Sequence, residues 1–188
     1  MHPKECDIIN SRLSNLKSVL VVTNDSTVFL KRGLASAFEM FGGRAEEVKR
    51  LVARLDIATK GGEKMCDVSF GVISSRFGFV PGNYVITNYE EVMSSKEDYM
   101  RIQEEKDYLG QLNLISKYFD KIVICVPKGM FEMILKDNTF QEGKVIAVTS
   151  PSFEGECIER GWTYLERRGA RVGTENAEKI FRMIESIS

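Results

Sequence analysis

The sequence predicts a three-layer α/β fold of the Rossmann-like kind, in which helices cover both faces of a mostly parallel sheet of about four to five strands. Two observations support this fold class. The apolar runs are short, continuous and rich in β-branched residues, which is typical of strands covered on both faces. Segments with helical spacing alternate with these runs, and this alternation favours β-α-β crossovers and a parallel sheet. We expect residues 1–188 to form a single α/β domain.

The first half of the chain alternates between expected helices and strands. The elements are a helix up to about Leu16, a strand at 18–23, a helix at 29–41, a helix at 45–55 and a strand at 66–74. The first strand is a continuous β-branched run, and each helix has apolar residues spaced for one helical face. After the second strand we expect an aromatic-glycine turn that Pro81 and Gly82 close.

The second half of the chain alternates in the same way. Ser94 and Glu97 fit a capping box, which predicts the start of a helix that runs to about Phe119. The run 121–126 is the clearest buried strand in the sequence. The elements expected after it are a helix at 130–135, a strand at 144–149, a helix at 156–167, a short edge strand at 170–172 and a helix that begins at Thr174.

The charge balance argues against a general nucleic-acid binder. Lys and Arg number 26 and Asp and Glu number 27, so the formal net charge is −1, whereas nucleic-acid binding proteins normally show a basic excess. The only dense basic cluster consists of Arg167, Arg168 and Arg171, and we interpret it as a solvated helix end and turn. Nucleic-acid binding through these three arginines is therefore the weakest of the functions that we consider.

Composition also limits the cellular locations and the kinds of active site that we expect for this protein. No window approaches the run of about 20 apolar residues that a membrane helix needs, and the N-terminus lacks the apolar core of a secretory signal. The four cysteines form no C-x-x-C pair, so we expect no metal site and a reducing, cytoplasmic location. The single histidine, His2, argues against a Ser-His-Asp site and against a metal centre with several imidazole ligands.

Polar loops follow the expected strands at 23–27, 74–78, 127–129 and 149–152. Because the carboxyl ends of parallel strands share one edge of a sheet, we expect these loops to form a binding site there. Hydroxyl groups, single cations and helix amino ends favour an anionic or polar small molecule, such as a phosphate or a carboxylate. The sequence contains no P-loop, no G-x-G-x-x-G and no G-x-S-x-G motif, so it identifies no cofactor.

Individual residues of these loops are candidates for ligand binding. They are Arg76 and Lys128 for contact with negative charge, Ser75, Asn24 and Ser150 for orientation, and Gly78 for the shape of the loop. Each has a structural alternative, which is helix capping for the small polar residues and pairing with a carboxylate or a helix end for Arg76. The spacing selects no carboxylate for acid–base work among Asp25, Asp67, Glu90 and Glu91.

The block that begins at Ser74 resembles a block in a known family. It reads Ser74-Ser75-Arg76-Phe77-Gly78-Phe79-Val80-Pro81, with Ile86, Tyr89 and Met93 behind it. The match covers about residues 68–93 and is similar to the YaaA peroxide-stress family and to a group of uncharacterised phage and prokaryotic domains. The first strand departs from that group, because it ends in Thr23-Asn24-Asp25-Ser26 and not in a Cys-Ser-Lys type of turn. The resemblance implies an α/β protein linked to nucleic-acid or nucleobase metabolism.

The function expected from the sequence is the binding of a small anion, or of a nucleotide- or nucleobase-related molecule, at the carboxyl edge of the sheet. The sequence does not say whether a reaction follows. The alternative is a non-catalytic interaction protein or a homo-oligomer, in which the charged helix from Ser94 and the aromatic residues Tyr84 and Tyr89 contact a partner chain. The lack of histidine chemistry and of a metal motif favours this alternative.

Overall fold

A six-stranded sheet with the order β10-β9-β8-β1-β5-β6 is the centre of the computed structural model, which describes residues 15–137 and 140–188. The strands are β1 (Ser18–Asn24), β5 (Asp67–Ser74), β6 (Gly78–Pro81), β8 (Lys121–Cys125), β9 (Val145–Thr149) and β10 (Thr163–Glu166). Only β6 runs antiparallel to its neighbour. The predicted α/β class with a mostly parallel sheet is confirmed, and the sheet is larger than the four to five strands expected.

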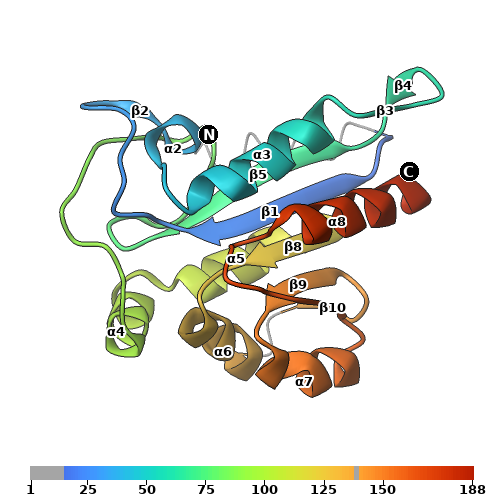
Figure 1. Cartoon of the computed structure of the whole chain (residues 1–188). Helices are drawn as coiled ribbons and strands as arrows, with labels where there is room; N and C mark the ends of the chain where they lie inside the picture. The colour runs from blue at the N-terminus through green and yellow to red at the C-terminus, as the bar shows by residue number, and fades with distance from the viewer. Residues whose placement is uncertain (1–14, 138–139) are drawn as a thin grey trace.

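Helices cover both faces of this sheet (Figure 1). One layer contains α2 (Ala37–Met40), α3 (Ala45–Asp56) and α8 (Thr174–Ile187). The other contains α4 (Lys96–Lys106), α5 (Tyr108–Ser116), α6 (Lys128–Asp137) and α7 (Glu154–Glu159), with the short 3₁₀ helix η1 (Pro151–Phe153) before α7. Two small antiparallel pairs lie outside the sheet, namely β2 (Ala35–Ser36) with β7 (Val85–Ile86) and β3 (Thr59–Lys60) with β4 (Glu63–Lys64).

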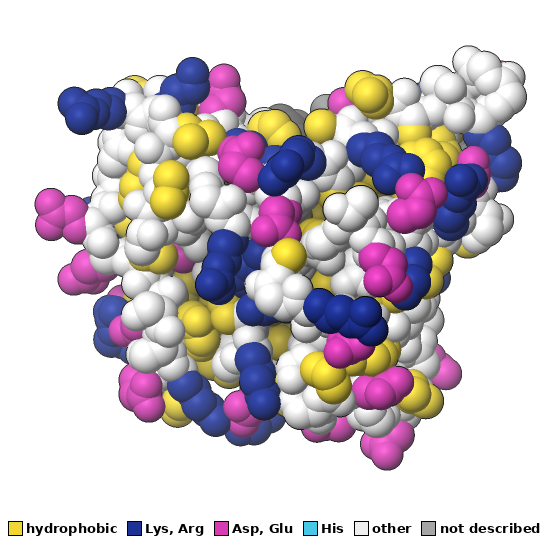
Figure 2. All heavy atoms as spheres, viewed as in Figure 1, with side chains coloured by type: hydrophobic (Ala, Val, Ile, Leu, Met, Phe, Trp, Pro, Cys, Tyr) yellow, Lys and Arg dark blue, Asp and Glu magenta, His cyan; other side chains and the backbone are white. Residues whose placement is uncertain are grey.

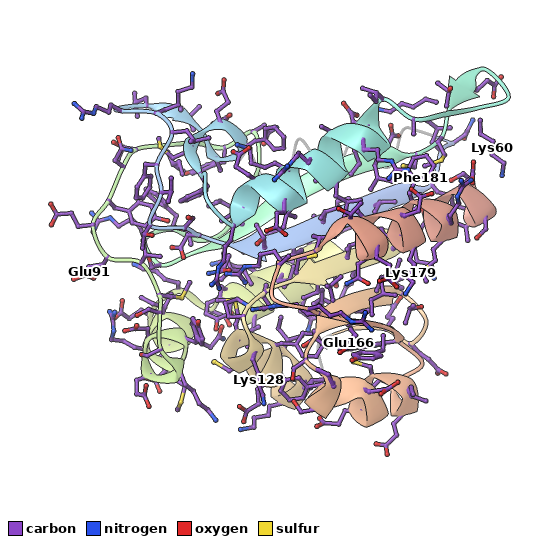
Figure 3. All side chains as sticks on the ribbon, viewed as in Figure 1. Lys60, Glu91, Lys128, Glu166, Lys179 and Phe181 are labelled. Atoms are coloured by element: carbon purple, nitrogen blue, oxygen red, sulfur yellow. The ribbon has the colours of Figure 1, made fainter. Side chains whose placement is uncertain are left out.

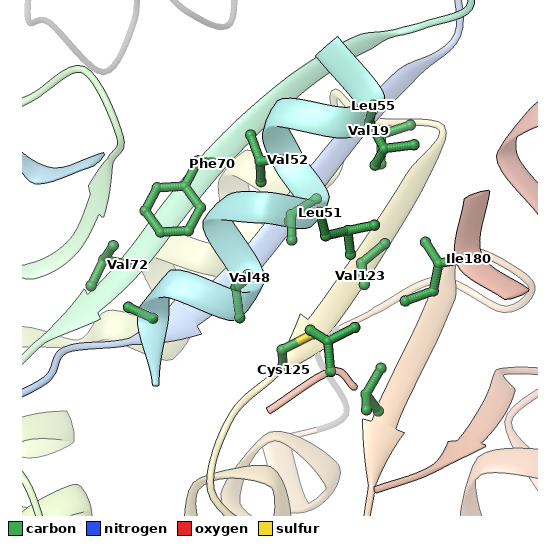
Figure 4. Close-up of a cluster of buried hydrophobic side chains, with 14 of the residues drawn as sticks. Val19, Val48, Leu51, Val52, Leu55, Phe70, Val72, Val123, Cys125 and Ile180 are labelled. Carbon is green, nitrogen blue, oxygen red and sulfur yellow. The ribbon is translucent and has the colours of Figure 1, made fainter. Parts of the chain in front are cut away.

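The central strand β1 is buried along its whole length because it has a helical layer on each side. Successive side chains of a strand point to opposite faces. Val19 and Val21 therefore pack with α3 and α8, whereas Leu20 and Val22 pack with the layer of α4 to α7. Figure 4 shows the first of these two cores, in which Leu51 of α3 lies over the sheet.

The strand order places a topological switch point beside β1. The chain leaves β1 and forms β5 on one side, and then crosses to form β8 on the other side of β1. In open α/β sheets, such a reversal creates a crevice beyond the carboxyl ends of the two diverging strands. Here the crevice lies beyond Asn24 of β1 and Cys125 of β8.

The expected helix at 29–41 is wrong for most of its length, because only α2 is helical. The chain before α2 is a loop with a series of bends, in which the N–H of Leu30 donates to the carbonyl of Met40 and the ring of Phe29 packs on Phe41. Leu30 and Leu34 are 51% and 78% exposed, so their helical spacing does not mark a buried face. The helix expected at 45–55 is confirmed as α3.

The helix expected from Ser94 to Phe119 is two helices, α4 and α5. Asp107 lies between them in a left-handed backbone conformation, with φ 47°, and ends α4. Its side chain caps α5 by accepting a hydrogen bond from the N–H of Gly110. The capping box also lies one residue later than expected, with Ser95 and Asp98 as its members. Two boxes overlap in the sequence, and the structure uses the one whose serine has extended backbone angles.

The segment after β9 differs most from the expectation. The expected helix at 156–167 stops at Glu159, and Gly161, with φ 65°, turns the chain into the edge strand β10. The edge strand expected at 170–172 is instead a loop. A glycine at positive φ is a common end to a helix, and the partly exposed pattern of β10 suits a sheet edge.

Two further expectations concern the ends of elements. The aromatic-glycine turn expected after β5 contains the strand β6, so Gly78–Pro81 returns along β5 as a hairpin. The amphipathic helix expected before Leu16 falls almost entirely on residues 1–14, outside the described residues, as do His2 and Cys6.

Candidate ligand-binding site

A cavity of about 430 Å³ lies at the switch point, beyond the ends of β1 and β8. Its walls come from segments far apart in the sequence, which meet only because the parallel strands end at one edge of the sheet. The lining consists of residues 24–28 after β1, 43–45 at the start of α3, 92–94 and Tyr99 around the start of α4, Pro127 after β8, and Arg171 between β10 and α8. In Figure 1 this edge is the one toward which the arrows of β1 and β8 point.

Asp25 lines the cavity and is buried, with 3% of the residue exposed. Its backbone N–H donates to the carbonyl of Ile73, which continues the pairing of β1 with β5 by one residue. Its Oδ2 accepts from the N–H of Ser75 at 2.8 Å, the hydroxyl of Ser75 at 2.9 Å and the hydroxyl of Tyr89 at 2.9 Å. Its Oδ1 is buried and has no hydrogen-bond partner among the described residues.

Burial raises the pKa of Asp25, and the hydrogen bonds from Ser75 and Tyr89 and the charge of Arg171 oppose that rise in part. Burial also raises the pKa of Tyr89, so its hydroxyl stays protonated and donates to the carboxylate. The N–H of Ser75 and the hydroxyl of Tyr89 therefore hold the Asp25 side chain in one orientation, and the Ser75 hydroxyl is shared between Asp25 Oδ2 and the carbonyl of Glu91. Asp25 Oδ1 has no partner among the described residues.

Asn24, at the end of β1, is arranged in a similar way. Its Nδ2 donates to the carbonyl of Asp25 at 3.0 Å, and this bond identifies the other terminal atom as the oxygen. Asn24 Oδ1 is buried without a partner in the part of the chain that the structure describes. Two neighbouring residues that line the cavity thus each carry an unpaired oxygen acceptor.

Arg171 enters the cavity from the loop between β10 and α8. This residue is only 6% exposed, and its Nε and Nη1 have no hydrogen-bond partner within residues 15–137 and 140–188. No carboxylate of those ranges lies within ion-pair distance of it. Burial and the charges of Arg167 and Arg44 lower the pKa of Arg171 to about 10, so the guanidinium is still charged at neutral pH.

The loop that carries Arg171 is held down at both ends. Arg167 Nη1 donates to the carbonyl of Val126 beyond β8 at 3.0 Å, and Asn176 Nδ2 donates to the carbonyl of Glu166 at 2.8 Å. The N–H of Val172 donates to Glu47 Oε2 on α3 at 3.3 Å. Arg171 is therefore placed over the sheet edge by contacts to β8, β10 and α3.

The cavity has a positive environment. The exposed Arg44 lines the cavity and is the N-cap residue of α3, which has no side-chain cap. The amino end of a helix carries partial positive charge. Arg167 adds a second guanidinium charge that acts on Arg171. Figure 2 shows Lys and Arg side chains gathered over the loop that joins β10 to α8.

The six candidate residues lie in different places. Asn24 lines the cavity. Ser75 forms two hydrogen bonds to Asp25, which also lines the cavity. Arg76 is exposed and lines a separate hollow of about 340 Å³ with Arg101 and Lys106. A ligand-binding role for these residues stays a prediction.

The other three candidates have identifiable structural contacts outside the cavity. Lys128 is exposed, with its Nζ 5.6 Å from the ring centre of Phe153, on the α7 side of α6 (Figure 3). Ser150 caps η1 by accepting from the N–H of Ser152. Gly78 has φ 73°, which only glycine adopts readily, and starts β6 beside Gln111. Binding by these residues likewise stays a prediction.

Sequence reasoning did not select Asp25 or Arg171. Asp25 was one of four carboxylates without a distinguishing spacing, and Arg171 was assigned to a solvated basic cluster and to an expected strand. The burial of a charged residue depends on which segments cover it, and no local pattern around residue 171 reports that. The polar stretch that follows β1 was the one signal that pointed toward Asp25.

No protein-family model, no curated protein and no solved structure matches this chain. The resemblance of residues 68–93 to the YaaA family stays a prediction. Among residues 15–137 and 140–188, no group of three or more His, Cys, Asp or Glu side chains is placed to hold a metal ion. The same residues include no helix that is long and apolar enough to cross a membrane.

Proposed function

We propose that this protein binds a small anionic molecule, of the phosphate or carboxylate class, in the cavity at the switch point of its sheet. The observation that carries the proposal is the buried guanidinium of Arg171, which lines the cavity without a hydrogen-bond partner on Nε or Nη1. A buried charge that lacks a partner is costly, and charged groups inside proteins are normally paired.

An anion in the cavity would remove this cost. Phosphate and carboxylate oxygens form short, charge-assisted hydrogen bonds with guanidinium groups. Arg44 and Arg167 add positive charge on the same side, and the amino end of α3 adds its dipole. Asp25 feels the charge of Arg171, but Asp25 Oδ1 and the Nε and Nη1 of Arg171 have no hydrogen-bond partner among the described residues, so Asp25 does not pair with them.

The position and the size of the cavity extend the proposal to a nucleotide- or nucleobase-related ligand. Ligands of open α/β sheets bind beyond the carboxyl ends of the strands at the switch point. The volume of about 430 Å³ falls within the range of small-molecule sites, roughly 300–1,000 Å³. It therefore leaves room for more than a single phosphate group.

Thermal unfolding in the presence of anions tests this proposal. Inorganic phosphate and adenosine monophosphate should raise the Tm of the native protein, because a ligand that binds only the folded state stabilises it. The variant Arg171→Met should lose that response. Arg168→Met is the matched control, since Arg168 lies in the same loop but is exposed and pairs with Glu166.

The two variants separate a site from a general effect of salt. If Arg171→Met responds to phosphate as strongly as the native protein does, the proposed site is wrong. If neither phosphate nor adenosine monophosphate shifts the Tm of the native protein, the proposed function is wrong.

The alternative of an interaction protein or a homo-oligomer stays a prediction. Tyr84 and Tyr89 pack against the core and are only partly exposed, so they offer less surface than their sequence suggests. Leu34 and Val85 are 78% and 58% exposed beside the β2–β7 pair. Light scattering after size exclusion, with Leu34→Ser as a comparison, measures whether the chain self-associates through this region.

A further inference from the structure

The walls of the switch-point cavity require more of a ligand than negative charge. On the proposed function of anion binding, we further propose that the ligand is an anion that also carries hydroxyl groups, such as a sugar phosphate or another hydroxylated phosphate ester. The anion would bind Arg171, and its hydroxyls would donate to Asp25 and Asn24.

The cavity contains unpaired groups of both hydrogen-bonding types. Arg171 has unpaired donors at Nε and Nη1, and Asp25 and Asn24 have unpaired acceptors at their Oδ1 atoms. The three residues are between 3% and 6% exposed and all line the same cavity. Buried polar groups in folded proteins are nearly always paired, so four unpaired atoms around one cavity indicate groups that a ligand completes.

The structure determines which terminal atoms of Asp25 and Asn24 are left without a partner. Ser75 and Tyr89 occupy Oδ2 of Asp25, and the carbonyl of Asp25 occupies Nδ2 of Asn24. Each side chain is therefore already committed through one terminal atom. The remaining atom of each is an oxygen that only a donor group can satisfy.

An anion without hydroxyl groups satisfies this arrangement only in part. Sulfate would pair with Arg171 but would leave both acceptors unpaired, and its charge would be repelled by the Asp25 carboxylate. A hydroxyl group on the ligand is neutral and donates a hydrogen bond to an oxygen acceptor. A phosphate ester of a polyol supplies the charge at one end and the donors at the other.

The binding of two matched phosphate esters tests this inference. Glycerol 3-phosphate and propyl phosphate share a three-carbon chain and a phosphate group, and they differ by two hydroxyl groups. Isothermal titration of the native protein should give a dissociation constant for glycerol 3-phosphate that is lower by about tenfold or more, as expected for a hydrogen bond to a charged acceptor. Glycerol alone should not bind measurably.

Two variants assign the preference to the proposed residues. In Asp25→Asn, propyl phosphate should bind more tightly than to the native protein, because the repelling charge is removed. The preference for glycerol 3-phosphate should fall severalfold in the same variant, because an amide is a weaker partner than a carboxylate. Arg171→Met should lose both esters.

The outcomes distinguish this inference from the proposed function. If both esters bind the native protein equally well and Arg171→Met loses both, the anion site stands and the hydroxyl requirement is overturned. If Asp25→Asn keeps the full preference, the assignment to Asp25 is overturned. If neither ester binds the native protein, the proposed function itself fails. The comparison of the two esters on the native protein decides the main point even if a variant does not fold.

Discussion

The contacts of Asp25 differ most clearly from those that the sequence pattern predicts for a polar residue after a strand. The polar stretch after a strand ordinarily caps a helix, yet no helix begins directly after Asp25. Its carboxyl group is instead buried and accepts three hydrogen bonds on one oxygen. Ser75 comes directly after β5 and Tyr89 comes from the loop after β7, so this environment is entirely tertiary.

The stability of the protein should depend on pH through Asp25. Burial raises its pKa above the ordinary value of 3.8, so the folded state binds this proton more tightly than the unfolded state does. The free energy of unfolding therefore decreases as the pH rises from the ordinary value through the raised pKa. Asp25→Asn removes this titration, and its stability relative to the native protein should increase across that window and then level off.

Urea denaturation of both proteins from about pH 3 to pH 8 measures this difference. A stability difference that stays constant over the whole range would contradict the prediction. A difference that decreases with rising pH would mean that the pKa of Asp25 is lowered, not raised.

Arg171 should cost stability when no anion is present. A buried guanidinium without a partner loses its hydration and gains little in return. In phosphate-free buffer, Arg171→Met should therefore raise the free energy of unfolding by about 1 kcal/mol or more, since Met fills similar space without a charge. Urea denaturation measures this change in the free energy of unfolding. The control variant Arg168→Met, at an exposed site, should change the free energy of unfolding by less than about 0.5 kcal/mol. A less stable Arg171→Met would show that the side chain has partners in the unliganded protein.

Among the elements, α4 shows how backbone geometry determines which of two serines is the N-cap. Ser94 and Ser95 both precede the helix, and a capping box can be drawn from either of them. Ser95 has φ −119° and ψ 166°, and its hydroxyl accepts from the N–H of Asp98, so it is the N-cap. Ser94 Oγ contacts only the Asp98 side chain at 3.3 Å.

Removal of the two serine hydroxyls should therefore have unequal effects. Ser95→Ala should lower the free energy of unfolding by about 1 kcal/mol, as is typical for the loss of an N-cap. Ser94→Ala should lower it by less than about 0.5 kcal/mol, because the site is exposed. Equal effects in thermal or urea unfolding would contradict the assignment of the N-cap to Ser95.

At the scale of the whole molecule, the three arginines of the basic cluster do not form one surface. Arg168 is exposed and pairs with Glu166 and Glu175. Arg167 donates to the carbonyl of Val126, and Arg171 is buried at the switch point. The cluster in the sequence is thus divided among an ion pair, a backbone contact and a cavity.

This division predicts that nucleic acid does not bind the folded protein. The net charge of −1 provides no general attraction to phosphate backbones, and a nucleic-acid site needs several accessible cations in a row. Fluorescence anisotropy with short labelled duplex DNA and single-stranded RNA should show no saturable binding at about 150 mM salt. Saturable binding that weakens with added salt and is lost in Arg168→Met would contradict the prediction.

The sequence by itself determined the fold class and most of the sheet. The runs that form β1, β8 and β9 are continuous and apolar because each strand is covered on both faces. That pattern is local, so it survives in a single sequence. The same reasoning located the carboxyl edge and included Asn24 and Ser75 among the candidates.

Only the tertiary structure decided where the edge strand lies, that the helix divides at Asp107, and which residues line the cavity. Thr163–Glu166 forms a strand because β9 offers a free edge. Asp25 accepts a hydrogen bond from Tyr89 and lines the same cavity as Arg171 because the connections that carry them end at one edge of the sheet. The burial of a charged side chain depends on the segments that surround it. Asp25 and Arg171 line the same cavity although they are far apart along the chain. Neighbouring residues in the sequence therefore carry no record of it.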